Sequence, residues 1–253
     1  MSETVRQALV TAAVLVIGDE ILSGRTQDAN SSYIAKWLGE LGIQLREIRV
    51  VPDIQDEIIS ALNALRARYA YVFTTGGIGP THDDITADAV ATAFGVGIDY
   101  HPQAMEILGA HYAPGEFTEA RKRMARIPDG AELIENPISK APGFQIGNVF
   151  VMAGIPVVMH AMLESLRHRL VGGARVLSQA VGGAVAEGQV AAALGVLHAE
   201  FPDVSFGSYP YYRDNGYGVN FVMRSTDSEQ LGKAVDGVRQ MIRDVGAEPV
   251  EGN

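Results

Sequence analysis

The sequence predicts an α/β fold: a doubly wound, mostly parallel sheet in three α/β/α layers, followed by a small α+β domain. Strand-like and helix-like segments alternate over roughly the first 100 residues, which is typical of parallel sheets with right-handed crossovers. The first strand, residues 11–17, is apolar without a break from Ala12 onward, as expected of a strand covered on both faces. Beyond Val171-Gly172-Gly173 the pattern changes. We therefore expect one domain over residues 1–172 and a second over 173–253.

The elements of the first domain follow from hydrophobic spacing. A helix is expected near residues 31–41, because Ile34, Trp37 and Leu38 lie on one stripe and Gly42 follows as a helix stop. Asp53 can cap the next helix, over residues 55–68. The remaining strands are expected at 43–51, 71–75, 132–135, 144–147 and 149–152, and the remaining helices from 86, within 102–125 and at 157–170.

The second domain is predicted to run strand, helix, strand, strand, helix. These elements are expected at 175–181, 187–200, 204–209, 217–224 and 228–245. An aromatic and basic cluster lies among them, formed by Tyr209, Tyr211, Tyr212 and Arg213. The cluster could contact a ring or a partner, but a strand edge or a contact between subunits explains it as well.

Composition and charge exclude several classes of protein. The chain has 253 residues, of which 47% are hydrophobic and 20% charged, as in globular proteins. Lys plus Arg number 20 against 30 for Asp plus Glu, and this net charge of −10 argues against nucleic-acid or anionic-membrane binding. The absence of cysteine excludes disulfides, thiolate metal sites and a cysteine nucleophile. No apolar run approaches a membrane span, and residues 1–9 are polar, so we expect a cytoplasmic protein.

Polar and glycine-rich segments follow three of the predicted strands, at 18–30, 74–86 and 153–156. Ligands of open α/β sheets gather outside the carboxyl ends of the strands, so these segments predict one shared site. Gly18, Asp19 and Glu20 open the first segment. Asp28 and Asn30 close it, and helix capping would explain these two without a ligand. In the third segment Gly154 allows close approach and Pro156 suits a helix start, although a structural turn accounts for both.

The middle segment carries the strongest signal for phosphate binding. Gly76, Gly77 and Gly79 lie between a strand that ends at Thr75 and a helix that begins near Thr86. Such a loop brings backbone amides close to an anion, although a tight turn without a ligand would look the same. The loop, which continues through Thr81, is neither a Walker loop nor the dinucleotide fingerprint.

Two adjacent carboxylates follow this loop. Asp83 and Asp84 would repel a bound phosphate unless a hard divalent metal lay between them, so both are candidate metal ligands. Capping of the following helix is the structural alternative for either carboxylate, and Thr86 could also serve as the cap.

Four motifs, taken in order, resemble those of the MoaB/Mog molybdopterin-binding domain family. They are GDEILSGRTQDAN at 18–30, VVPD at 50–53, TTGGIGPTHDDIT at 74–86 and AGIP at 153–156. The nearest branches are the N-terminal part of CinA, the competence/damage-inducible protein, and the molybdopterin-binding-like domain of eukaryotic FAD synthases. The similarity covers residues 11–170, and FPDVSFGSYP at 201–210 is similar to the small domain that follows in CinA.

The resemblance implies a substrate-binding site made of Gly18, Asp19, Glu20, Asp28, Asn30, Thr75, Gly76, Gly77, Gly79, Thr81, Thr86, Gly154 and Pro156. It implies that Asp53 and Asp84 act in adenylyl transfer or hydrolysis, and that Asp83 matches an extra acid of the two nearest branches. Those branches are associated with hydrolysis of the pyrophosphate bond of ADP-ribose or FAD by means of a divalent metal.

The leading hypothesis is therefore a hydrolase: a nucleotide pyrophosphatase that uses magnesium, manganese or cobalt. One alternative is a non-catalytic module that binds molybdopterin or a nucleotide, and another is a molybdopterin adenylyltransferase of molybdenum cofactor biosynthesis. The sequence stops short of the amidohydrolase domain of full CinA, so deamidation of nicotinamide mononucleotide is not expected. Because relatives commonly form dimers or trimers, we also expect a homo-oligomer.

Overall fold

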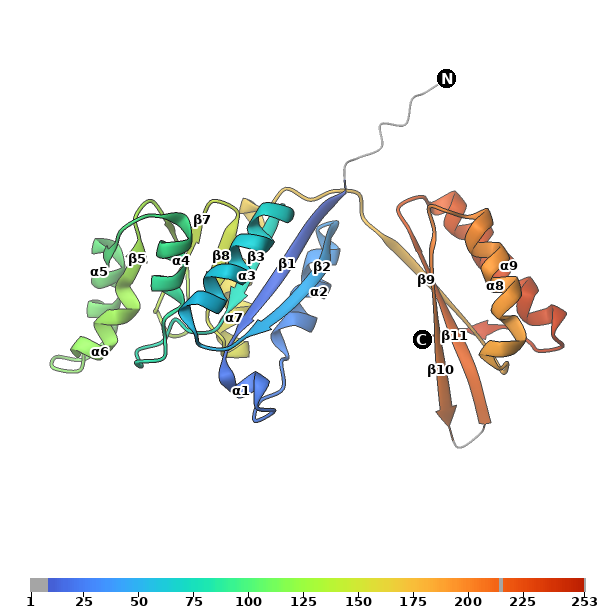
Figure 1. The fold of residues 1–253 in the computed structure, drawn as a ribbon, viewed down its shortest axis with the longest axis horizontal. Coiled ribbons are helices and arrows are strands. Elements are labelled where there is room, and N and C mark those ends of the chain that lie inside the picture. Colours follow the sequence, from blue (N-terminus) through green and yellow to red (C-terminus); the bar gives the residue numbers. More distant parts are fainter. Residues whose placement is uncertain (1–8, 214–215, 253) are drawn as a thin grey trace, which may run out of the picture. The chain divides into compact units, whose positions relative to one another are not determined.

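The computed structural model describes residues 9–213 and 216–252, apart from the side chain of Arg213. The polar segment at 1–8 and the Arg213 side chain, both considered above, lie outside the described residues. The chain divides into two compact units, Met1–Gly173 and Ala174–Asn253 (Figure 1). No helix in the described part of the chain is both long and apolar enough to cross a membrane.

The first unit is built on a six-stranded sheet with the order β2-β1-β3-β8-β7-β6. Neighbours among the first four strands run parallel, whereas β7 and β6 are antiparallel additions at one edge. The sheet is therefore mostly parallel, and the predicted fold class is confirmed. The strands are β1 (Val10–Ile17), β2 (Ile43–Val51), β3 (Tyr71–Thr75), β6 (Glu132–Ile134), β7 (Gly143–Ile146) and β8 (Val149–Met152).

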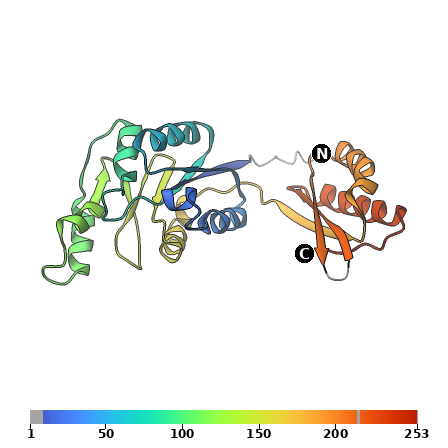
Figure 2. The same ribbon diagram turned by 60° about the horizontal axis from the view of Figure 1, so that its bottom comes forward.

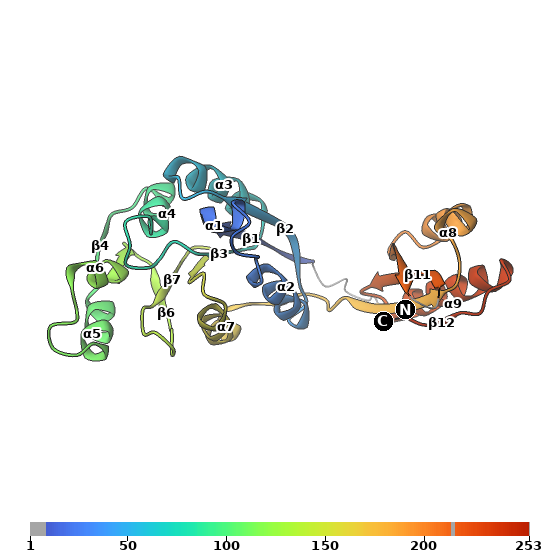
Figure 3. The same cartoon turned by 90° about the horizontal axis from the view of Figure 1, so that it is seen from below.

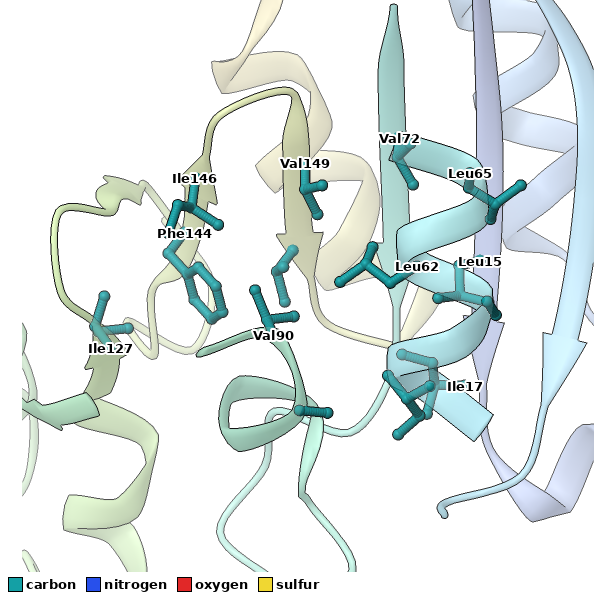
Figure 4. Close-up of a cluster of buried hydrophobic side chains, with 14 of the residues drawn as sticks. Leu15, Ile17, Leu62, Leu65, Val72, Val90, Ile127, Phe144, Ile146 and Val149 are labelled. Atoms are coloured by element: carbon teal, nitrogen blue, oxygen red, sulfur yellow. The ribbon is translucent and has the colours of Figure 1, made fainter. Parts of the chain in front are cut away.

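Helices cover both faces of this sheet. The α3 (Gln55–Arg68) and α4 (Thr86–Phe94) helices lie on one face, and α2 (Asn30–Glu40) and α7 (Pro156–Ser165) lie on the other (Figure 3). Each face has its own buried cluster. Figure 4 shows the cluster under α3 and α4, where Leu15 and Val72 from the sheet meet Leu62 from α3. Alternating side chains of a strand point to opposite faces, so β1 contributes Ala12, Val14 and Val16 to the second cluster.

A long excursion separates α4 from β6. It contains β4 (Ile98–Tyr100), α5 (Pro102–His111), α6 (Glu119–Lys122), a 3-10 helix η1 (Arg123–Ala125) and β5 (Arg126–Pro128). The sequence interpretation missed β4 and β5, because these three-residue strands pair only with each other. It also extended α7 too far, since that helix ends at Ser165 and a separate 3-10 helix, Arg167–Arg169, follows.

The second unit has a four-stranded antiparallel sheet with the order β10-β11-β9-β12. Its elements are β9 (Leu177–Gly183), α8 (Glu187–Glu200), β10 (Ser205–Arg213), β11 (Gly216–Ser225), α9 (Ser228–Asp244) and β12 (Val250–Glu251). Both helices lie on the same face of the sheet (Figure 2) and share a buried cluster with it. The predicted α+β order is confirmed, and the two-residue β12 was missed.

Candidate functional site

The register of the parallel strands brings the candidate segments to one edge of the sheet. Val50 of β2 and Thr75 of β3 lie on either side of Val16 of β1, and Thr75 lies opposite Met152 of β8. These four residues form one row across the sheet. The motifs that follow them therefore leave the sheet side by side, as the sequence predicted from strand ends alone.

Hydrogen bonds then join the four loops to one another. The Gly18 N–H donates to Val51 O at 3.2 Å, and the Gly76 N–H donates to Met152 O at 3.1 Å. The side-chain amide of Asn30, at the start of α2, donates to Gly154 O at 2.7 Å. These bonds link the ends of β1, β2, β3 and β8 to the first turn of α2. The site thus rests on a rigid frame.

Glycine is required at two positions of the loop after β3. Gly76 has φ +105° and Gly77 has φ +66°. A Cβ on Gly76 would collide with Ile17 O, and a Cβ on Gly77 would collide with the Thr86 hydroxyl. The fully buried Thr86 holds the loop in this shape, because its hydroxyl donates to Gly76 O at 3.0 Å and its N–H donates to Gly77 O at 3.0 Å. Thr86 therefore stabilises the loop through these two hydrogen bonds. It is the first residue of α4 and not its cap.

The rest of the glycine loop is free to bind an anion. Within the described residues, the amides of Gly77, Ile78 and Gly79 have no hydrogen-bond acceptor. Residues 80–85 connect this loop to α4, but Thr86 at the N-terminus of α4 contacts Gly76 and Gly77, so the helix dipole favours negative charge here. The backbone can accordingly offer several donors to a phosphate.

Asp84 is partly engaged inside this loop. Its carboxylate accepts hydrogen bonds from the Thr81 N–H, at 2.8 Å, and from the Thr81 hydroxyl. The absence of a side chain at Gly79 makes room for Asp84, since a Cβ there would lie 2.7 Å from Asp84 Oδ2. Asp83 is the freer of the two acids, with 60% of its side chain exposed. The nearby Thr81 hydroxyl and its own backbone N–H lower the pKa of the Asp83 carboxyl, which keeps it ionised.

Asp53 does not cap α3, and that sequence prediction was wrong. The capping position of α3 is Ile54, which makes no side-chain cap hydrogen bond. Asp53 Oδ2 instead accepts the N–H of Asp19, at 3.0 Å, at the start of the short helix α1 (Asp19–Leu22). The carboxylate thus serves a helix 34 residues earlier in the chain, which local spacing could not reveal.

An acidic cluster surrounds Asp53. Burial raises the pKa of the Asp53 carboxyl, and the negative charges of Asp19, Glu20 and Asp83 raise it further against the opposing Asp19 N–H. These four acids come from the loops after β1, β2 and β3. A carboxyl whose pKa is raised by burial and by neighbouring acids is typical of a functional site.

The remaining predicted residues divide into two kinds. Asp28 caps α2, because its Oδ1 accepts the N–H groups of Asn30 at 2.9 Å and Ser31 at 3.2 Å. Pro156 occupies the first turn of α7 and is exposed. The Thr75 hydroxyl and the Oδ1 of Asn30, in contrast, are buried without a partner in the described structure. Orphaned polar atoms at the strand ends are uncommon and point to a polar ligand or water at this edge.

Residues 13–171 match a family model described as a probable molybdopterin binding domain. This chain belongs to the molybdopterin-binding domain family. The resemblance noted from the four motifs is confirmed. The second unit has its own match in this molybdopterin-binding-domain protein, since residues 175–251 fit the model of the FAD synthase middle domain.

The match to this molybdopterin-binding-domain protein covers different shares of its relatives' lengths. A CinA-like protein of Citrifermentans bemidjiense is 42% identical over 158 residues, which are 60% of this chain and 38% of that one. A protein of Archaeoglobus fulgidus is 31% identical over 91% of this chain and 97% of its own length. A crystal structure of the protein CinA, with unknown function, from Thermoplasma acidophilum is 33% identical with a TM-score of 0.61, over 64% of this chain and 98% of that one. The chain thus spans 38% of the length of the CinA-like relative, and 59% of a 38%-identical protein from Aeropyrum pernix.

One feature of the molybdopterin-binding domain was missed by sequence reasoning. A small pocket behind the glycine loop is lined by Gly77, Ile78, Gly79, Asp84, Ala87, Asp88, Arg123, Met124, Arg126, Ile127, Pro142 and Phe144. Figure 4 shows Ile127 and Phe144 at one end of the buried cluster of α3 and α4. The basic run of residues 121–126 was the available signal, but such a run is usually a solvated surface.

Proposed function

We propose that the first unit binds the phosphate groups of a nucleotide or a pterin against the amides of Gly77, Ile78 and Gly79, and hydrolyses the pyrophosphate bond of ADP-ribose or FAD. The observation that carries this proposal is the position of Asp53. Its carboxyl has a raised pKa and interacts with Asp83, which follows the loop that holds the free amides. A phosphate binder and a proton acceptor on adjacent loops are the parts that hydrolysis of a phosphate bond requires.

The carboxylates of the site suit a hard divalent metal. Magnesium is usually held by one or two carboxylates, with substrate phosphates and water completing its ligands. Among the described residues no group of three or more His, Cys, Asp or Glu side chains could hold a metal ion, so a metal here would need substrate phosphates and water as its other ligands. Asp83 and Asp84 would hold it, and when bound it would neutralise the charge of the phosphates.

The protein's own groups account for the remaining steps of the proposal. The loop amides bind one phosphate and orient the pyrophosphate bond. Asp53 accepts a proton from the water that attacks phosphorus, and the bond from that phosphorus to the bridging oxygen breaks. ADP-ribose would yield AMP and ribose 5-phosphate. A raised pKa brings the carboxyl nearer to the value that favours proton transfer at neutral pH.

Binding without turnover is the second candidate. The engagement of Asp84 by Thr81 favours it, because that carboxylate has fewer oxygen lone pairs left for a metal. The same loop amides would then hold molybdopterin or a nucleotide with no chemical change.

One experiment separates the two candidates. The full chain is incubated with ADP-ribose and with FAD in the presence of magnesium, manganese or cobalt, and AMP is measured. Calorimetric titrations with the same ligands run in parallel. AMP release that disappears in Asp53→Asn supports hydrolysis, and saturable binding without AMP supports the binding module. If the chain neither binds these ligands nor releases AMP with any of the metals, the proposed function is refuted.

Homo-oligomer formation is likewise a proposal. Tyr209 and Tyr212 lie on β10, which is an edge strand of the second sheet, and are 51% and 88% exposed. Tyrosine is enriched at protein interfaces, and edge strands readily pair with other chains. Light scattering at micromolar concentration should give a mass above that of one chain, and Tyr212→Ser should lower it. A monomeric mass for the unaltered protein would contradict this proposal.

A further inference from the structure

Two segments of unlike chemistry line the pocket behind the glycine loop. Gly77, Gly79 and Asp84 follow β3, whereas Arg123 and Arg126 belong to the segment from η1 to β5. Apolar side chains such as Phe144 complete the lining. The loop that offers free amides to an anion therefore shares a pocket with two guanidinium groups.

The basic residues of this segment differ in their partners. Arg126 makes a bidentate ion pair with Asp88, with N–O distances of 2.8 and 2.7 Å. Lys122 pairs with Glu119 at 2.6 Å, and Arg121 lies 3.7 Å from Glu116. Within the described residues Arg123 has no carboxylate partner, and its Nε is buried without any hydrogen-bond acceptor. Of the four cations in this run, Arg123 is therefore the one whose charge the described chain does not compensate.

A buried guanidinium N–H without an acceptor is unfavourable for the folded protein, because water has been lost and nothing replaces it. Arg126 cannot supply the pocket with free positive charge, since Asp88 accepts hydrogen bonds from both of its terminal nitrogens. Asp84 contributes negative charge to the same lining. An anionic ligand at this position thus depends on Arg123 for its charge balance.

The chemistry of guanidinium narrows the class of ligand. Its planar fork of donors matches the oxygens of a phosphate in a bidentate manner and binds it more selectively than an ammonium does. The neighbouring amides of Gly77 and Gly79 provide further donors of the kind that phosphates use. Phosphate is the anion whose oxygens suit both the guanidinium and the amides.

We propose that Arg123 binds a phosphate of the ligand together with the Gly77–Gly79 loop, with which it lines the pocket. This inference rests on the proposed function, because it assigns a further binding residue to the same site. It extends that site to the excursion between α4 and β6, which none of the four motifs contains.

The test is calorimetric titration of the full chain with ADP, and with adenosine as a ligand without phosphate, in buffers with magnesium and with a chelator. Arg123→Gln should weaken ADP binding about tenfold or more, the scale of a lost charge-assisted hydrogen bond, and leave adenosine binding unchanged. Arg121→Gln is the matched control. It removes the same charge two residues before Arg123, and the Arg121 side chain is already paired with Glu116. It should change ADP affinity less than twofold. Arg123→Lys keeps the charge but loses the fork, so its affinity should lie between those of Arg123→Gln and the unaltered protein.

Thermal melting distinguishes a ligand-binding role from a structural one. Without ligand, Arg123→Gln should melt at or above the temperature of the unaltered protein, since an unpaired buried N–H has been removed. The rise in melting temperature produced by ADP should shrink in this variant. The contrary result has two parts. Ligand-free Arg123→Gln melts several degrees lower or fails to fold, while Arg123→Lys melts normally and binds ADP with undiminished affinity. That result would assign Arg123 a structural role and overturn the inference.

The two levels of proposal fail in different ways. Equal ADP affinity in Arg123→Gln and the unaltered protein would overturn the role of Arg123 and leave the proposed function standing. An unaltered protein that binds ADP in neither buffer would refute nucleotide binding itself, and the role of Arg123 with it.

Discussion

Replacing Asp53 with asparagine separates its proposed chemical role from its structural one. Asparagine retains an oxygen that can accept the Asp19 N–H, which Asp53 Oδ2 accepts at 3.0 Å. It cannot take a proton from water at neutral pH. If Asp53 is the proton acceptor, AMP release should fall by about 100-fold or more, the scale typical of a lost general base.

The stability of this variant follows from two opposing effects. Exchanging a charged acceptor for a neutral one weakens the hydrogen bond from Asp19 by about 1 kcal/mol. Removing the repulsion between Asp53 and each of Asp19, Glu20 and Asp83 stabilises the folded protein by roughly 0.3 kcal/mol for each pair, as for exposed charges in water. These two effects nearly cancel, and the substitution also removes the cost of burying the Asp53 charge, so at neutral pH the melting temperature should stay within about 3 °C of the unaltered protein's or rise.

The pH dependence has a definite sign. The pKa of Asp53 is raised in the folded protein, so the folded state holds this proton more tightly than the unfolded chain does. Its contribution to stability is present below the ordinary pKa of 3.8, declines as pH rises through the folded pKa, and is constant above it. Asparagine does not titrate. The melting temperature of Asp53→Asn relative to the unaltered protein should therefore increase with pH across that interval and then level off.

Melting by circular dichroism from pH 3.5 to 8 and AMP release at neutral pH should be measured on the same preparation. Asp53→Ala serves as the comparison, because it also removes the acceptor of the Asp19 N–H and should be the less stable variant at every pH. Full activity in Asp53→Asn would remove Asp53 from the chemistry. A difference in melting temperature that decreases with pH would refute the electrostatic reasoning.

Three further substitutions test the glycine loop. Thr86→Val removes the hydroxyl that donates to Gly76 O and should lower the free energy of unfolding by about 1–2 kcal/mol, seen as a lower urea midpoint with an unchanged slope. Gly77→Ala should lower it by about 1–3 kcal/mol because φ is +66° and the new methyl group meets the Thr86 hydroxyl; a midpoint equal to that of the unaltered protein would contradict the described loop shape. Asp84→Asn keeps an oxygen for Thr81 and should unfold within about 1 kcal/mol of the unaltered protein. Its AMP release should nevertheless fall about 100-fold if the carboxylate acts in catalysis, and unchanged release would exclude that role.

The parts of the fold that depend on local patterns could be predicted from the sequence. Residues 12–17 and 149–152 are apolar throughout, and both lie in interior strands of the sheet. Gly42 was expected to end a helix and has φ +72° directly after α2. The convergence of the motifs was also predictable, because parallel strands place their carboxyl ends on one edge.

The parts that depend on distant contacts could not be predicted. Asp53 lies two residues before α3, where spacing favours a cap, but it accepts the N–H of Asp19, which is 34 residues earlier at the start of α1. Arg123 lies in a run of basic residues that looks like ordinary surface, and only the fold places it behind the glycine loop. The strands β4 and β12 are too short to show any alternation.

The strand order has a consequence for the time at which the site can form during synthesis. Ribosomes make the glycine loop early, whereas β8, the neighbour of β3 in the sheet, begins only at Val149, 74 residues after β3 ends at Thr75. Until β8 leaves the exit tunnel, the Gly76 N–H lacks Met152 O and Asn30 lacks Gly154 O. The nascent chain therefore carries the glycine loop without these two hydrogen bonds until β8 has been made. A ligand that needs the completed site could stabilise the finished domain but not the early folding steps.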